Sequence, residues 1–189
     1  MKIQLTFFTL MAGHTHGSYN LVLKEVDGIR KLPIIVGTFE AQSIATEIEG
    51  ISPQRPLTHD LMVAMLNGLE VELKEVLIYD LRNGVFFARL ILSKAGLTYD
   101  IDARTSDAVA IAIRTKSPIF IEEHLMQEIG IDEKEFQSTS TNVKPANAIE
   151  SNDYTQYTRA QLKSMLEQAV EAENYVKAAL IRDELNKNK

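Results

Sequence analysis

The chain of 189 residues contains no cysteine, which excludes disulfide bonds and thiolate metal sites. It also lacks an apolar run of the ~20 residues that a membrane-spanning helix needs. Basic residues are outnumbered, with 20 Lys and Arg against 26 Asp and Glu and a net charge of −6. These absences predict a cytoplasmic protein that does not enter a membrane and is not a general electrostatic binder of nucleic acid.

The remaining composition is that of a globular protein. A hydrophobic content of 45% supports a real core, and the length suits one domain with an appendage. The first apolar stretch, residues 5–12, is interrupted by Thr6 and Thr9 and preceded only by Lys2. We therefore interpret it as a β-strand and not as a signal peptide.

The apolar spacing over residues 1–130 predicts an α+β domain with a mixed β-sheet packed against helices. The expected strands are residues 2–12, 18–26, 32–36, 71–82, 85–93, 97–103 and 118–121, and the expected helices are residues 38–49, 58–69, 106–115 and 122–129. Asn83-Gly84 predicts a two-residue hairpin turn, because both turn positions need a positive φ. Thr58 is the expected N-cap of the second helix, and Asp60 lies in its first turn.

The last third of the chain differs in kind. Residues 131–157 are rich in polar turn formers and predict a flexible linker. In residues 158–189, apolar side chains recur at helical spacing on both sides of a break near 173–174, which predicts an antiparallel helical hairpin. So short a hairpin buries too little surface to be stable alone, so we expect it to pack on a copy of itself or on a partner.

Two stretches place ionisable groups where a compact domain should have its core. One is residues 55–61, and the other is residues 100–107, which run directly into the apolar helix at 108–114. Buried charge costs several kcal/mol unless it is paired or bound. The groups in these stretches are therefore either structural ion pairs or parts of a site.

Three positions in these stretches have a spacing that suggests a site. Asp107 and Arg114 are seven residues apart, close to two helical turns, so they line one stripe of an otherwise apolar helix. His59 opens the second helix and is a candidate general base or metal ligand. Asp102 and Arg104 share one strand face by alternation, although a solvent-facing strand explains that face as well.

Two further carboxylates have local explanations beside a functional one. Asp80 shares a strand face with Arg82 next to the hairpin turn, and a cross-strand pair with Arg89 would account for it. Glu40 lies in the first turn of its helix, where the helix dipole alone favours a negative charge.

Several of these residues stand in motifs that resemble the bifunctional nuclease domain family over residues 1–128. The motifs are Pro-Leu-Thr-His-Asp-Leu at 56–61, Asp-x-Arg-x-Ser-Asp-Ala at 102–108, Phe-Glu-Ala-Gln at 39–42 and the hairpin at 80–89. The resemblance implies DNase and RNase activity. It favours His59 and Glu40 as site residues over their local explanations.

Phosphodiester hydrolysis needs an activated water and a cation at the developing charge. The candidate catalytic residues are His59, Asp60, Asp102, Asp107, Glu40 and Asp80. Their carboxylates are the oxygen ligands that a divalent Mg²⁺ or Mn²⁺ ion would use, although the sequence does not assign a ligand set. Arg104 and Arg114 are the candidate phosphate ligands, since a guanidinium holds phosphate with two hydrogen bonds.

The tail resembles the UVR motif, the short helical hairpin of the excision-repair proteins UvrB and UvrC. The candidate partner-binding residues are Leu162, Leu166, Ala169, Tyr175, Ala178, Ala179 and Arg182, and together with Glu173 and Asp183 they carry this resemblance. The resemblance implies a docking element for a protein partner or for a second copy, in DNA repair or a stress response.

Two interpretations of the whole chain remain open. In the first it is a nuclease acting on DNA or RNA, with a docking tail. In the second it is a non-catalytic regulatory or adaptor module, in which the Asp and Arg residues form structural ion pairs. The acidic balance favours the second, and the family resemblance favours the first. In both cases we expect a homo-oligomer, because so small a domain has an excess of apolar and charged-stripe surface.

Overall fold

The computed structural model describes residues 1–13, 17–132, 136, 158–171, 181 and 185. The chain divides into two compact units, Met1–Asn147 and Ala148–Lys189. None of the helices in the described part of the chain has the length and apolar character that a membrane crossing requires.

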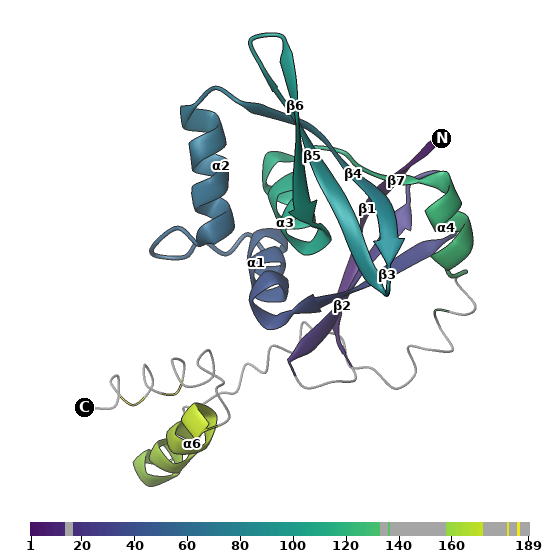
Figure 1. The fold of residues 1–189 in the computed structure, drawn as a ribbon. Helices are drawn as coiled ribbons and strands as arrows, with labels where there is room; N and C mark the ends of the chain where they lie inside the picture. Colours follow the sequence, from purple (N-terminus) through teal and green to yellow (C-terminus); the bar gives the residue numbers. More distant parts are fainter. Residues whose placement is uncertain (14–16, 133–135, 137–157, 172–180, 182–184, 186–189) are drawn as a thin grey trace. The chain divides into compact units, whose positions relative to one another are not determined.

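The first unit is built on a mixed seven-stranded sheet with the order β3-β2-β1-β7-β4-β5-β6, shown in Figure 1. The strands are β1 (Lys2–Ala12), β2 (Ser18–Glu25), β3 (Lys31–Gly37), β4 (Glu72–Arg82), β5 (Val85–Lys94), β6 (Leu97–Arg104) and β7 (Ile119–Glu122). β4 and β7 pair in parallel, and every other neighbouring pair is antiparallel. The prediction of an α+β fold with a mixed sheet is confirmed.

Within residues 1–13 and 17–132, four helices accompany the sheet. They are α1 (Thr38–Ile48), α2 (Thr58–Gly68), α3 (Thr105–Thr115) and α4 (Glu123–Ile129). Figure 1 shows α1, α2 and α3 gathered together on one side of the strands, while α4 lies away from them beside β7. The expected helices agree with these to within one or two residues.

The helix α3 is the centre of this arrangement. It packs against β4 and β5 and also against α1 and α2. Every residue from Ala108 to Ala112 is buried. Three of the five are alanines, whose small side chains let neighbouring elements approach closely. As a result, polar groups on α3 lie within reach of α1 and α2.

Two tight turns set the register of the outer strands. Asn83 and Gly84 both have positive φ, at 51° and 77°, which confirms the predicted hairpin turn between β4 and β5. Ala95 and Gly96 repeat the arrangement between β5 and β6, with φ of 50° and 80°. The second turn was not predicted, because alanine is not a residue that signals a positive φ.

One local prediction is wrong. Thr58 does not cap α2, because the helix begins at Thr58 and Leu57 occupies the N-cap position. The free backbone N–H of Leu57 donates instead to Asp60 Oδ2 at 2.8 Å. Asp60 thereby satisfies an amide that would otherwise lack a partner at the helix start.

Some of the described residues beyond position 130 belong to the first unit and the others to the second. Ile131 forms a bridge with Lys31, and the ring of Phe136 lies edge-on to that of Phe8 at 5.9 Å. Residues 131, 132 and 136 of the predicted linker therefore belong to the first unit, and residues 133–135 and 137–157 lie outside the described residues.

In the second unit, α6 (Arg159–Glu171) contributes Leu162, which is fully buried in a small cluster with Ile181. The expected second helix lies outside the described residues except at Ile181 and Leu185, and so do the side chains of Ala169, Tyr175, Ala178, Ala179 and Arg182.

Candidate functional site

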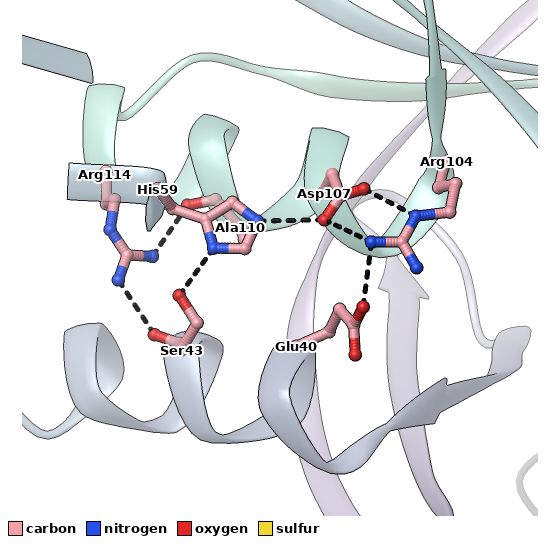
Figure 2. A network of polar contacts seen from close by, with 7 residues as sticks. All are labelled: Glu40, Ser43, His59, Arg104, Asp107, Ala110 and Arg114. Carbon is pink, nitrogen blue, oxygen red and sulfur yellow. Dashed lines mark hydrogen bonds and ion pairs between the residues drawn. The ribbon is translucent and has the colours of Figure 1, made fainter. Parts of the chain in front are cut away.

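His59 joins the three helices that meet on one side of the sheet. Its Nδ1 atom lies 2.8 Å from Ser43 Oγ on α1, and its Nε2 atom lies 3.0 Å from Asp107 Oδ1 on α3 (Figure 2). His59 is 7% exposed and Ser43 is 4% exposed. The imidazole is thus held at both nitrogens, between elements that are far apart in the sequence.

Asp107 continues this chain of contacts toward the surface. Arg104 donates from Nε to Asp107 Oδ2 at 2.8 Å and from Nη2 to Asp107 Oδ1 at 3.2 Å. The same Nη2 atom lies 2.8 Å from Glu40 Oε1 (Figure 2). Pairing with Asp107 raises the pKa of the Arg104 guanidinium further above its ordinary value.

These contacts place a proton on one nitrogen of His59. A carboxyl group that accepts N–H groups from Arg104 at both oxygens is a carboxylate, so Asp107 can only accept from His59. The Nε2 atom therefore carries a proton. In the tautomer protonated at Nε2 alone, Nδ1 accepts from the Ser43 hydroxyl, and Ser43, His59 and Asp107 then form a directional chain of hydrogen bonds.

Asp60 and Arg114 form a second polar link between the same helices. Arg114 donates from Nε to Asp60 Oδ1 at 2.7 Å, from Nη1 to the Ala110 carbonyl and from Nη2 to the Ser43 carbonyl, each at 3.0 Å. The side chain of Arg114 is 4% exposed, which leaves little room for a substrate. The predicted role of Arg114 as a phosphate ligand does not fit these contacts, which are those of a structural clamp.

Asp80 and Asp102 lie outside this cluster. Asp80 accepts from Arg82 Nε at 2.6 Å, and not from Arg89 as one alternative had it. A bulge in β4 between Ile78 and Asp80 shifts the pairing, so Asp80 stands opposite Phe87. The predicted gathering of Asp102 with His59 and Asp107 is not observed, since Asp102 accepts from the Tyr79 hydroxyl at 3.2 Å.

Four members of the predicted set, Glu40, His59, Arg104 and Asp107, line one pocket of about 300 Å³. Its polar lining includes Glu40, Ser43, His59, Arg104 and Asp107, and its apolar lining includes Phe39, Leu57 and Met62. A larger cavity of about 460 Å³ lies between α2, the end of α3 and the start of β4, away from the contact between His59 and Asp107. We take the smaller pocket as the candidate site, because its lining holds a complete chain of proton donors and acceptors.

Ser43 is the pocket residue that the sequence did not single out. A signal was available, since Ser43 and Glu40 are three residues apart and therefore share one face of α1. A serine in a helix interior has many ordinary explanations, however, and its contact with His59 depends on how two helices pack.

The described residues contain no group of three or more His, Asp or Glu side chains that could hold a metal ion. Glu40 and Asp107 come nearest to one, since each lies within 3.2 Å of Arg104 Nη2. The guanidinium occupies the space between them. The predicted carboxylate set of Glu40, Asp60, Asp80, Asp102 and Asp107 does not converge as a metal site.

Two segments of the chain match the models of known families. Residues 21–134 match the bifunctional nuclease domain, and residues 159–188 match the UvrB/uvrC motif. The chain belongs to the bifunctional nuclease domain family and carries a UVR motif in its tail.

Its relatives come from bacteria and plants. An uncharacterized protein of Mycobacterium tuberculosis is 43% identical over 123 residues, which cover 64% of this chain and 73% of the relative. Bifunctional nuclease 1 of Arabidopsis thaliana is 30% identical over 180 residues, covering 87% of this chain and 54% of the relative. The bifunctional nuclease of Oryza minuta is 30% identical over 184 residues, covering 87% and 53%. The chain spans about half the length of these plant relatives.

The clamp between Asp60 and Arg114 should make stability depend on pH. The hydrogen bond from Arg114 lowers the pKa of Asp60 below its ordinary value of 3.8. A lowered folded-state pKa contributes stability above the unfolded-state pKa, and that stability is lost as the pH falls through the folded-state pKa. We expect Asp60→Asn to lower the free energy of unfolding by roughly 1–2 kcal/mol at neutral pH, because Asp60 is partly exposed.

The measurement is urea unfolding of both proteins between pH 7 and pH 3, with Asp27→Asn in the exposed β2–β3 loop as the matched control. The difference between wild type and Asp60→Asn should shrink below roughly pH 4, where the Asp60 carboxylate of the unfolded chain takes up a proton before that of the folded chain does. A difference that stays constant over the whole range would rule out the ion pair as its source.

Proposed function

We propose that this chain is a nuclease that hydrolyses phosphodiester bonds of DNA or RNA in the pocket of His59, Arg104 and Asp107. The observation that carries the proposal is the chain of contacts from Ser43 through His59 and Asp107 to Arg104, which lines one pocket in a domain of the bifunctional nuclease family. The plant relatives named bifunctional nucleases support the reaction class.

Arg104 is the group that would hold the phosphate. Its side chain is 69% exposed, and its contacts with Asp107 and Glu40 use only Nε and Nη2. The two N–H groups of Nη1 are left for a non-bridging phosphate oxygen. A guanidinium fixed by two carboxylates is already oriented when charge develops in the transition state, which is the condition for electrostatic stabilisation.

His59 would act as the proton acceptor through Ser43. An attacking water gives a proton to Ser43 Oγ while the Ser43 hydroxyl proton passes to His59 Nδ1, and the resulting imidazolium is stabilised by Asp107. The oxygen of the water bonds to phosphorus, and the bond to the leaving oxygen breaks. The leaving oxygen lies on the opposite side of phosphorus and takes its proton from solvent, and His59 returns its proton to solvent through Ser43, which restores neutral His59.

The proposed activity could depend on a divalent metal ion, so the assay tests for one. Mg²⁺ is often bound by one or two carboxylates together with substrate phosphates, and Glu40 and Asp107 are the carboxylates of this pocket. Because the described residues do not form a ligand group, none of the steps above is assigned to a metal. Activity should be measured with Mg²⁺, with Mn²⁺ and with a chelator.

The second candidate function is a non-catalytic module. It is favoured by the observation that both nitrogens of His59 are held by the protein itself, and by the net charge of −6. In that case the network would serve to join α1, α2 and α3, and the UVR tail would recruit a protein partner in DNA repair or a stress response.

Substitutions in the chain of contacts separate the two functions. We expect His59→Gln to lower kcat by roughly 10²- to 10⁴-fold, the usual contribution of a general base. Asp107→Asn should lower kcat as well, because His59 loses the acceptor that orients it and Arg104 loses its partner. Ser43→Ala should have a smaller effect, because a water can take the place of the hydroxyl.

The assay uses single-stranded and duplex DNA and RNA, with thermal unfolding to show that each variant folds. The matched control is His124→Gln, which makes the same change at an exposed position on α4. Equal cleavage by wild type and His59→Gln would identify a contaminating nuclease and support the non-catalytic module.

We also propose that the first unit, and not the tail, makes the chain a dimer. Leu61 and Met65 on α2 and Leu69 at its end recur every four residues and are each more than half exposed. A continuous apolar stripe of this kind is typical of a surface that packs on another protein.

Light scattering of the full chain at micromolar concentration tests this. We expect a dimer for the wild type, a monomer for Leu61→Glu and an unchanged dimer for Leu162→Glu, which places the same charge in the core of the tail. A monomeric wild type, or a loss of mass only in Leu162→Glu, would contradict the proposal.

A further inference from the structure

Phe39 is exposed to solvent at the pocket. It lines the pocket together with Met62, yet the two side chains are 68% and 40% exposed. Phe39 is the residue before Glu40, whose carboxylate contacts the Arg104 guanidinium. An exposed aromatic ring thus lines the same pocket as the cation that the proposed function assigns to phosphate.

The pocket lining has few positive charges, so a contact that does not depend on charge would matter more for nucleotide binding here. Two carboxylates, Glu40 and Asp107, stand against the one guanidinium of Arg104 in the pocket lining. The chain as a whole carries a net charge of −6. Nonspecific affinity for a polyanion comes mainly from Lys and Arg contacts that release counterions, and this surface supplies few of them. The contact that compensates must therefore be made to the uncharged part of a nucleotide.

We infer that Phe39 stacks on an unpaired nucleobase whose neighbouring phosphate is bound by Arg104, so that the pocket takes single-stranded nucleic acid in preference to duplex. The inference rests on the proposed function, because it assigns the phosphate to Arg104. A base can stack on a protein ring only when it has left the stack of a duplex. A volume of about 300 Å³ lies at the lower end of the range for small-molecule sites, which suits one nucleotide and not a helix.

Phe39 and Met62 form the exposed rim of the pocket. The other possible occupant of this rim is a second copy of the chain. The proposed dimer stripe at Leu61, Met65 and Leu69 lies on the same helix as Met62. A dimer contact that extends to Phe39 would cover the ring and make it unavailable to a base. The two occupants give different results with the same set of variants.

The experiment measures binding and cleavage of a labelled single-stranded oligonucleotide and of its duplex by the full chain. We expect Phe39→Ala to weaken single-strand binding by about 5- to 150-fold, the usual contribution of one stacked base, and to leave duplex binding unchanged. Phe39→Trp should restore binding, while Phe39→Leu, which keeps an apolar side chain without a ring face, should not. The matched control is Ile35→Ala on β3, where the side chain is 77% exposed and does not line the pocket.

The salt dependence of binding gives a second readout. Stacking releases no counterions and the inference assigns a single phosphate, to Arg104, so single-strand affinity should fall with salt by a log–log slope of only about −0.7, that of one phosphate contact. A steep loss of affinity with salt would show that phosphate contacts dominate, and would overturn the inference.

Failure of the inference can be told apart from failure of the proposed function. If wild type cleaves through His59 but Phe39→Ala changes single-strand and duplex binding equally, the stacking role fails and the nuclease stands. Single-strand binding that depends on Phe39 without cleavage that depends on His59 supports stacking and removes the nuclease. A fall in molar mass of Phe39→Ala with unchanged strand preference assigns the rim to a second copy. A wild type that neither binds nor cleaves overturns both.

Discussion

The contacts of the Asp107 carboxylate are the interaction on which the rest of the site depends. Asp107 accepts two hydrogen bonds from Arg104 and lies within hydrogen-bond distance of His59 Nε2. It therefore holds Arg104, the only described arginine of the pocket lining, in place and directs a proton onto Nε2 of His59. The same contacts join the end of β6 and the starts of α2 and α3. The Asp107 carboxylate therefore both connects these three elements and orients the polar side chains of the pocket.

The sequence predicted the fold well wherever local chemistry decides the structure. Apolar periodicity located the strands and helices of the first unit, and Asn83-Gly84 located a hairpin turn because few other residues accept positive φ at both positions. The errors occur where a competing local contact decides. Asp60 satisfies the free amide of Leu57, so Thr58 is not the cap, and the turn at Ala95 depends on a conformation that alanine rarely adopts.

The site was less predictable, because its contacts join residues far apart in the chain. Helical spacing placed Asp107 and Arg114 on one stripe of α3. It could not show that Arg114 donates its hydrogen bonds to Asp60 and to two backbone carbonyls. The bulge in β4 that separates Asp80 from Arg89 leaves no mark in the sequence. Ser43 was missed because its partner lies sixteen residues away on another helix.

The most direct test of this account is which nitrogen of the His59 imidazole carries the proton, read from long-range ¹H–¹⁵N spectra of the ring. The exposed His124 serves as an internal reference. We predict a proton on Nε2 in the wild type, and loss of that preference in Asp107→Asn, because the carboxylate can only accept. A proton on Nδ1 in the wild type would contradict the account, since the chain from Ser43 to Asp107 would then point the wrong way.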